Sequence, residues 1–130
     1  MGALLKTLRD AGKQLIVATS KPTVYAERIL THFGVREYFA FAAGSELDGR
    51  RSKKGEVIKY ALESMRITHI EKAVMVGDRE HDIIGAKENG MDSIGVLYGY
   101  GGMRELTEAG ATCVAESVGG LSKLLMAAEG

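Results

Sequence analysis

Two carboxylates in the middle of the chain have the spacing of a site for a hard cation. Asp78 directly follows the apolar run VMVG, and Asp82 comes four residues later in the segment DREHD. If a helix begins after a strand here, Gly77 allows close approach to the strand tip, and the carboxylates lie one helical turn apart. Such a pair can share Mg²⁺, which prefers oxygen ligands. Acids also favour the start of any helix, but that effect does not require an aspartate at the strand tip, so we predict a metal site.

A second polar segment follows the apolar run QLIVA and contains Thr19, Ser20 and Lys21 before Pro22. Hydroxyl groups, a lysine and the N–H groups at a helix start can together hold a phosphate. Hydroxyl residues are also common helix caps. Taken by itself, this segment is better explained by capping.

A third segment places Lys54 at the expected start of a helix, where the helix dipole disfavours a cation. A phosphoryl group or a carboxylate nearby would explain a lysine at this position. Lys53 remains an alternative for the same role. For Arg50, Arg51 and Lys53 we favour the simpler interpretation of a solvated basic loop.

The remaining candidate residues give weaker indications of a functional site. The glycine-rich segment from Tyr98 to Met103 lacks the third glycine of a dinucleotide-binding fingerprint, because Arg104 stands there, and it is interpreted as a structural loop. Cys113 is expected to be a small buried side chain. The histidines are interpreted as structural or solvated, since no pair has metal-ligand spacing with a third partner: His32, His69 and His81.

Helical and strand patterns alternate between these positions. Helices are expected over residues 3–11, 22–33, 57–65, 80–89, 103–109 and 118–127, and strands over 14–18, 39–43, 73–76, 93–97 and 112–115. The second helix is expected to bury Tyr25, Ala26, Ile29, Leu30 and Phe33. This alternation predicts an α/β fold with a mostly parallel sheet between helices, whose ligands bind beyond the carboxyl ends of the strands.

Composition narrows the class of protein. The chain has 130 residues, 45% of them hydrophobic, which suits one globular domain, and its 17 basic and 17 acidic side chains balance. The balanced charge argues against nucleic acid as a partner. The single cysteine and the absence of a long apolar run or a signal-like start predict a cytoplasmic protein without membrane association.

Taken together, the motifs resemble the haloacid dehalogenase superfamily of phosphatases, in its phosphoglycolate phosphatase-like and nucleotidase-like branch. The resemblance extends over VATSKP, GSELDGRRSKKGEVIKYALE, VMVGDREHDIIGAKENG and SIGVLYGYG. It implies a three-layer, Rossmann-like parallel sheet. It also implies that Thr19, with Ser20 beside it, and Lys54 bind the phosphoryl group, that Asp78 binds Mg²⁺, and that Asp82 supports the metal and the catalysis.

The sequence departs from that family at one point. The family's nucleophile is the first Asp of an Asp-x-Asp-Gly motif on a first, central strand, and this strand, both aspartates and the helical cap are missing. Glu46-Leu47-Asp48-Gly49 is rejected as a substitute, because it follows a loop and offers Glu as the nucleophile. The missing strand would lie between the strands that end at Thr19 and Asp78. We therefore expect residues 1–130 to be the C-terminal part of a core domain, which alone is unstable and inactive.

The expected activity of the parent protein is Mg²⁺-dependent hydrolysis of a phosphomonoester through an aspartyl-phosphate. The substrate would be a small phosphorylated metabolite such as phosphoglycolate, or a nucleoside monophosphate. An alternative is a non-catalytic chain that binds phosphate and Mg²⁺, or that needs the missing segment or self-association to complete its sheet. A receiver-type signalling domain is disfavoured, because its phospho-acceptor strand should precede the Thr and Lys strands.

Overall fold

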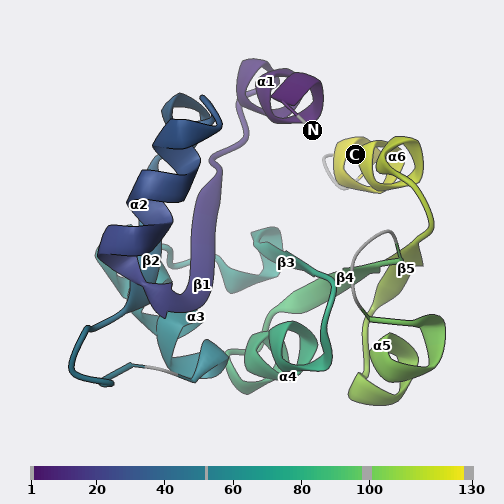
Figure 1. Cartoon of the computed structure of the whole chain (residues 1–130). Coiled ribbons are helices and arrows are strands. Elements are labelled where there is room, and N and C mark those ends of the chain that lie inside the picture. Colours follow the sequence, from purple (N-terminus) through teal and green to yellow (C-terminus); the bar gives the residue numbers. More distant parts are fainter. Residues whose placement is uncertain (1, 52, 98–100, 128–130) are drawn as a thin grey trace. The chain divides into compact units, whose positions relative to one another are not determined.

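Helices and strands alternate along the chain (Figure 1). The structure is a computed structural model that describes residues 2–51, 53–97 and 101–127. The chain divides into two compact units, Met1–Ile67 and Thr68–Gly130, and each unit has its own sheet.

The first unit is built on two parallel strands. Ile16 lies opposite Phe41 and Pro22 opposite Ser45, with an irregularity in register between Ala18 and Pro22. The elements of this unit are the helices α1 (Gly2–Asp10), α2 (Thr23–His32) and α3 (Lys54–Ser64), the short 3₁₀ helix η1 (Arg36–Tyr38), and the strands β1 (Ile16–Pro22) and β2 (Phe41–Ser45).

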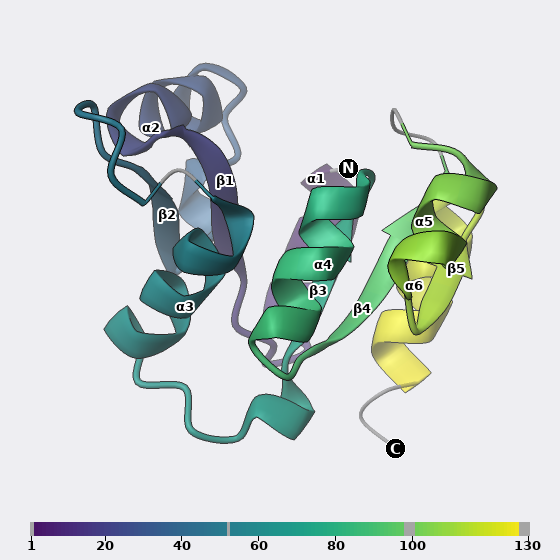
Figure 2. The ribbon, with the colours of Figure 1, turned by 90° about the horizontal axis from the view of Figure 1, so that it is seen from below.

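The core of the first unit lies between α3 and the two strands. Val57 and Ala61 of α3 are buried with Ala43 of β2, and the rings of Phe41 and Tyr60 lie 5.9 Å apart. Because alternate residues of a strand point to opposite faces, Ala42 of β2, between Phe41 and Ala43, faces away from α3. Helix α2 covers that other face (Figure 2).

The inner face of α2 differs from the prediction. Ala26 is buried and Leu30 half-buried as expected, but Tyr25, Ile29 and Phe33 are exposed, Phe33 to 72%. A small side chain at position 26 lets the helix approach the strands closely. The larger side chains therefore lie on the outer face of α2, where nothing in the described part of this unit buries them.

The second unit contains three parallel strands in the order β3-β4-β5. Its strands are β3 (Val74–Gly77), β4 (Asp92–Val96) and β5 (Cys113–Ala115), and its helices are η2 (Ile70–Lys72), α4 (Glu80–Glu88), α5 (Met103–Ala109) and α6 (Val118–Ala127). Ile83 and Ala86 of α4 and Leu106 of α5 are fully buried.

Glycine and cysteine positions in this unit follow from the packing. A Cβ atom at Gly95 would lie 2.9 Å from Cδ1 of Leu106, so the glycine makes room for α5 against β4. The prediction of a buried Cys113 was wrong: its side chain is exposed. Cys113 is the first residue of a three-residue strand at the edge of the sheet, and burial is reached only at Ala115.

The parallel α/β architecture is confirmed, but the strands form two sheets. Within the described residues, β1 pairs with β2 and β3 pairs with β4, and no hydrogen-bonded ladder joins β1 to β3.

Candidate active site

The first unit brings Thr19 and Lys54 to the same part of β1. Lys54 is the first residue of α3, and its Nζ donates a hydrogen bond of 3.3 Å to the carbonyl oxygen of Ala18. Oγ1 of Thr19 accepts a 3.2 Å bond from the N–H of Lys21, within the irregular stretch of β1 between Ala18 and Pro22. A hydroxyl and an ammonium group, 35 positions apart in sequence, thus lie at neighbouring residues of β1.

The neighbouring residues Ser20 and Lys53 lie differently. Both side chains are exposed, whereas Thr19 and Lys54 are half-buried. Lys53 precedes α3, and its N–H donates to Oε1 of Glu56 over 3.3 Å. Of the two lysines considered from the sequence, it is Lys54 whose side chain bonds to β1, at Ala18.

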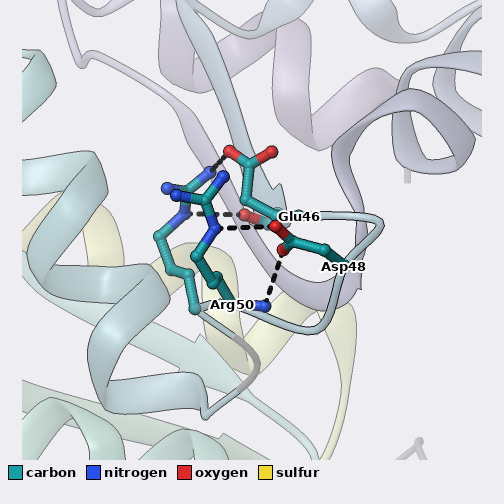
Figure 3. Close-up of polar contacts among 5 residues, drawn as sticks. Glu46, Asp48 and Arg50 are labelled. Carbon is teal, nitrogen blue, oxygen red and sulfur yellow. Dashed lines mark hydrogen bonds and ion pairs between the residues drawn. The ribbon is translucent and has the colours of Figure 1, made fainter.

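The loop before α3 is held by two arginine–carboxylate pairs (Figure 3). Asp48 accepts bonds from the backbone N–H and the Nε of Arg50, at 3.1 and 2.9 Å. The backbone N–H of Arg50 holds the pKa of the Asp48 carboxyl below its ordinary value. Glu46 accepts a 2.7 Å bond from Nη2 of Arg51. The carboxylates of this acidic segment therefore have structural partners within their own loop.

Arg51 is not the solvated residue that the sequence predicted. Its Nε donates to the carbonyl oxygen of Gly44 at the end of β2 over 3.1 Å, and its guanidinium lies 3.7 Å from the centre of the Tyr60 ring. The backbone of Arg51 adopts φ +56°, a left-handed conformation that costs free energy for a non-glycine residue. These contacts of Arg51 connect β2 to α3. These contacts could not be predicted from the sequence, since Arg50 and Arg51 are adjacent and alike.

A cavity of about 360 Å³ lies beside these residues within the first unit. Its lining comes from the start of α2, the end of β2, the loop after β2, and α3: Thr23, Val24, Ser45, Glu46, Leu47, Arg51 and Tyr60. It is thus at the carboxyl end of the strands, where ligands of parallel α/β proteins bind.

The second unit presents Asp78 just beyond the tip of β3. Oδ2 of Asp82 accepts bonds from the backbone N–H groups of Asp78 and Arg79, at 3.2 and 3.4 Å. A Cβ atom at Gly77 would lie 2.3 Å from Cβ of Asp82, so this contact requires a glycine. Asp82 is buried, and Asp78 is half-buried. Asp82 therefore holds the turn that carries Asp78.

A residue that the sequence did not indicate also contacts this turn. Oε2 of Glu105, from α5, accepts a 2.7 Å bond from the N–H of Glu80 and a 3.0 Å bond from Nε of Arg79. The Glu80 N–H, with the Arg79 guanidinium, lowers the pKa of the Glu105 carboxyl. The N–H of Gly101 donates to the carbonyl oxygen of Asp78 over 2.7 Å. The glycine-rich segment is a structural loop at this residue, while Tyr98, Gly99 and Tyr100 lie outside the described residues.

The donor set at the tip of β3 fits a hard cation in part. Mg²⁺ is commonly held by one or two carboxylates, with water and phosphate oxygens completing its shell, and Asp78 and Asp82 are two carboxylates at one turn. Because Oδ2 of Asp82 binds backbone N–H groups, Asp78 is the better candidate for a direct ligand. In the part of the chain that the structure describes, no three His, Cys, Asp or Glu residues form a metal cluster.

The predicted residues are therefore assembled as two pairs. Thr19 and Lys54 lie together in the first unit, and Asp78 and Asp82 in the second. The three predicted structural histidines are exposed, and His69 lies 3.2 Å from Oε1 of Glu71.

Parallel strands with polar side chains at their carboxyl ends define the class: an α/β protein of the Rossmann-like type. The chain belongs to the haloacid dehalogenase-like hydrolase family, because residues 1–96 match the sequence model of that family.

Named relatives are similar over most of this chain. It is 48% identical over 101 residues to the tyrosine-protein kinase PtkA of Mycobacterium tuberculosis. The aligned region covers 78% of this chain and 34% of the relative. It is 47% identical over 103 residues to a 5'-nucleotidase of Pseudomonas aeruginosa, covering 79% of this chain and 46% of the relative. The chain thus spans less than half the length of these relatives.

A solved structure shares the fold closely. The crystal structure of a predicted phosphatase from Clostridium acetobutylicum superposes with a TM-score of 0.92 at 49% identity, over 96% of this chain and 57% of that one. Among the described residues, no helix has the length and apolar character needed to cross a membrane.

Proposed function

We propose that this chain supplies the phosphate-binding and metal-binding residues of a Mg²⁺-dependent phosphomonoesterase. The observation that carries the proposal is the position of Lys54, whose ammonium group bonds to the carbonyl oxygen of Ala18 in β1, next to Thr19. Membership of the hydrolase family supports the reaction class. An ammonium and a hydroxyl at neighbouring positions of a strand can both donate hydrogen bonds to the oxygens of a phosphoryl group.

The proposed reaction begins when a carboxylate from outside this chain attacks the phosphorus atom. A carboxylate oxygen–phosphorus bond forms, the ester oxygen–phosphorus bond breaks, and the leaving oxygen takes up a proton. Water then hydrolyses the aspartyl-phosphate, which releases inorganic phosphate and restores the carboxylate. Lys54 and Thr19 orient the phosphoryl group and stabilise its charge throughout, because phosphoryl transfer depends mainly on positioning and electrostatics.

Asp78 would hold the metal ion in this proposal, and Asp82 would keep Asp78 in place through the backbone of the turn. Mg²⁺, when bound, supplies positive charge next to the phosphoryl oxygens. Small phosphorylated metabolites such as phosphoglycolate, and nucleoside monophosphates, are the proposed substrates. The similarity to a 5'-nucleotidase supports the second class.

The test compares two adjacent lysines. In the protein that carries this chain together with the residues encoded upstream, Lys54→Gln should lower kcat/KM for p-nitrophenyl phosphate by about 100-fold, as losing a charge-stabilising donor does. Lys53→Gln is the matched control, since its exposed side chain lies one position away, and it should change kcat/KM by less than about 2-fold. Equal losses in both variants, or none in Lys54→Gln, would contradict the assignment.

Two alternatives have distinct outcomes. A non-catalytic chain would bind phosphate and Mg²⁺ in calorimetric titrations without any hydrolysis.

The relative named as a tyrosine-protein kinase motivates one further assay, in which ATP replaces the phosphomonoester and a phosphorylated tyrosine is sought. Phosphorylated tyrosine without phosphomonoester hydrolysis would replace the hydrolase proposal.

A further inference from the structure

The turn between β3 and α4 is held by an acidic side chain from a distant part of the second unit. Glu105 lies 25 positions after Glu80, yet its Oε2 accepts the Glu80 N–H at 2.7 Å and the Arg79 Nε at 3.0 Å. Glu80 is the first residue of α4, and its N–H has no partner within the helix.

The side chain just before a helix usually accepts from the second or third N–H of the helix, so the first N–H depends on another partner, and Arg79 at this position makes no capping bond. The acid within the first turn, Asp82, uses Oδ2 for the N–H groups of Asp78 and Arg79. Glu105 therefore completes a set of bonds that a local cap does not provide.

The contacts around Asp78 leave little freedom to the turn. Its N–H donates to Asp82, and its carbonyl oxygen accepts from Gly101 at 2.7 Å. A Cβ atom at Gly101 would lie 2.2 Å from the Asp78 oxygen and 3.1 Å from Oε2 of Glu105. Gly101 and Glu105 thus both contact the turn that carries Asp78.

We propose that Glu105 is a positioning residue for the metal centre, which fixes the orientation of Asp78 through the backbone at Arg79 and Glu80. The inference rests on the proposed function, since it takes Asp78 as the metal ligand. Simple helix capping would predict an effect on stability alone. Positioning predicts in addition a weaker affinity for the metal, because groups that hold a metal ligand contribute to metal binding.

The experiment uses the same longer protein as the hydrolysis test, with three variants and two measurements. Glu105→Ala removes the acceptor, Glu105→Gln keeps a side-chain oxygen at the same distance from the backbone, and Glu108→Ala removes another acid of α5. Glu108 is the matched control because its carboxylate pairs with Arg104 at 3.0 Å and not with the turn. Amide hydrogen exchange at Glu80 and binding of Mn²⁺, as a paramagnetic substitute for Mg²⁺, are measured.

The expected result is faster exchange at Glu80 and an affinity for Mn²⁺ lowered by about 10-fold in Glu105→Ala. Glu105→Gln should lose about 3-fold, because it keeps an acceptor but not the charge that pairs with Arg79, and Glu108→Ala should bind as the wild type does. Circular dichroism establishes that each variant is folded, and the Gln variant keeps the test decisive if the Ala variant unfolds.

Two negative results separate the inference from the proposed function. If Asp78→Asn weakens Mn²⁺ binding but Glu105→Ala and Glu105→Gln bind as the wild type, the positioning role is wrong and the metal assignment stands. If Asp78→Asn binds Mn²⁺ as well as the wild type, or the wild type does not bind it, the metal assignment is wrong and the inference is overturned with it.

Discussion

Gly77 determines how closely Asp82 packs against the end of β3. Any Cβ atom at this position would lie within 2.6 Å of three atoms of the Asp82 side chain: Cβ, Oδ2 and Cγ. Asp82 is buried, and its Oδ2 holds two backbone N–H groups of the turn. Gly77 is therefore required for the packing of Asp82 as much as for the position of Asp78.

Replacement of Gly77 is therefore expected to destabilise the fold. Gly77→Ala should lower the free energy of unfolding by about 1–3 kcal/mol, the range for overpacking a buried site. It should also weaken Mn²⁺ binding, because displacement of Asp82 moves the turn at Asp78. Chemical denaturation and metal titration measure the two effects.

Gly119→Ala is the control in the same unit. Gly119 lies in α6, and the nearest atom to a Cβ there is Oγ of Ser117 at 3.9 Å. Alanine at a helical position of this kind should raise the free energy of unfolding by about 0.5–1 kcal/mol. Equal stability of the two variants would show that the contact between Gly77 and Asp82 is not restrictive.

Among the elements, the loop between β2 and α3 leads directly into Lys54, the first residue of α3. Arg51 contacts the carbonyl oxygen of Gly44 and the ring of Tyr60, so one side chain bridges the end of β2 and the middle of α3. Arg50, its neighbour, pairs with Asp48 in solvent, where its side chain is 76% exposed. The adjacent arginines therefore have different structural roles.

We predict that Arg51→Ala lowers the free energy of unfolding by about 1–3 kcal/mol, because it removes a bond to a backbone carbonyl and an ion pair that is partly buried. Arg50→Ala should change it by less than about 0.5 kcal/mol, as exposed substitutions do. Arg51→Gly should be less destabilising than Arg51→Ala, since glycine adopts φ +56° without strain. Denaturant unfolding of the three variants checks the order, and equal stability of the Ala variants at 50 and 51 would contradict it.

Local pattern predicted the elements well, because apolar runs and glycine stops depend on neighbours in sequence. Strand β1 nonetheless extends four residues beyond its expected end at Ala18, to Pro22. The apolar stripe of α2 was a poor guide to burial, since spacing identifies a face but not what covers it. Tyr25 and Ile29 illustrate this, because both are exposed and the packed residue is the small Ala26.

Contacts over long sequence separations could not be predicted in the same way. Asp78 and Asp82 are four positions apart, about one helical turn, so this pair was identified from the sequence. The bond from Glu80 to Glu105 depends on how α5 packs beside α4, which no periodicity encodes. The roles of Arg51 and Glu105 therefore emerged only from the folded chain.

Across the molecule, the two proposed halves of the site belong to separate compact units with separate sheets. Lys54 and Thr19 are proposed to bind a phosphoryl group and Asp78 a cation, but the proposed reaction also needs an attacking carboxylate. The acids of the loop after β2, Glu46 and Asp48, are engaged by arginines. The chain covers 57% of the similar solved structure, which leaves room in such proteins for further catalytic residues.

We therefore predict that residues 1–130 alone do not hydrolyse p-nitrophenyl phosphate. A longer protein that contains this chain and supplies the attacking carboxylate should hydrolyse it. The hydrolysis assay is run on both proteins, with Lys54→Gln as the control in each. Hydrolysis by residues 1–130 that disappears in Lys54→Gln would place the nucleophile within this chain, and the carboxylates of Asp78 and Asp82 would then be the first to replace.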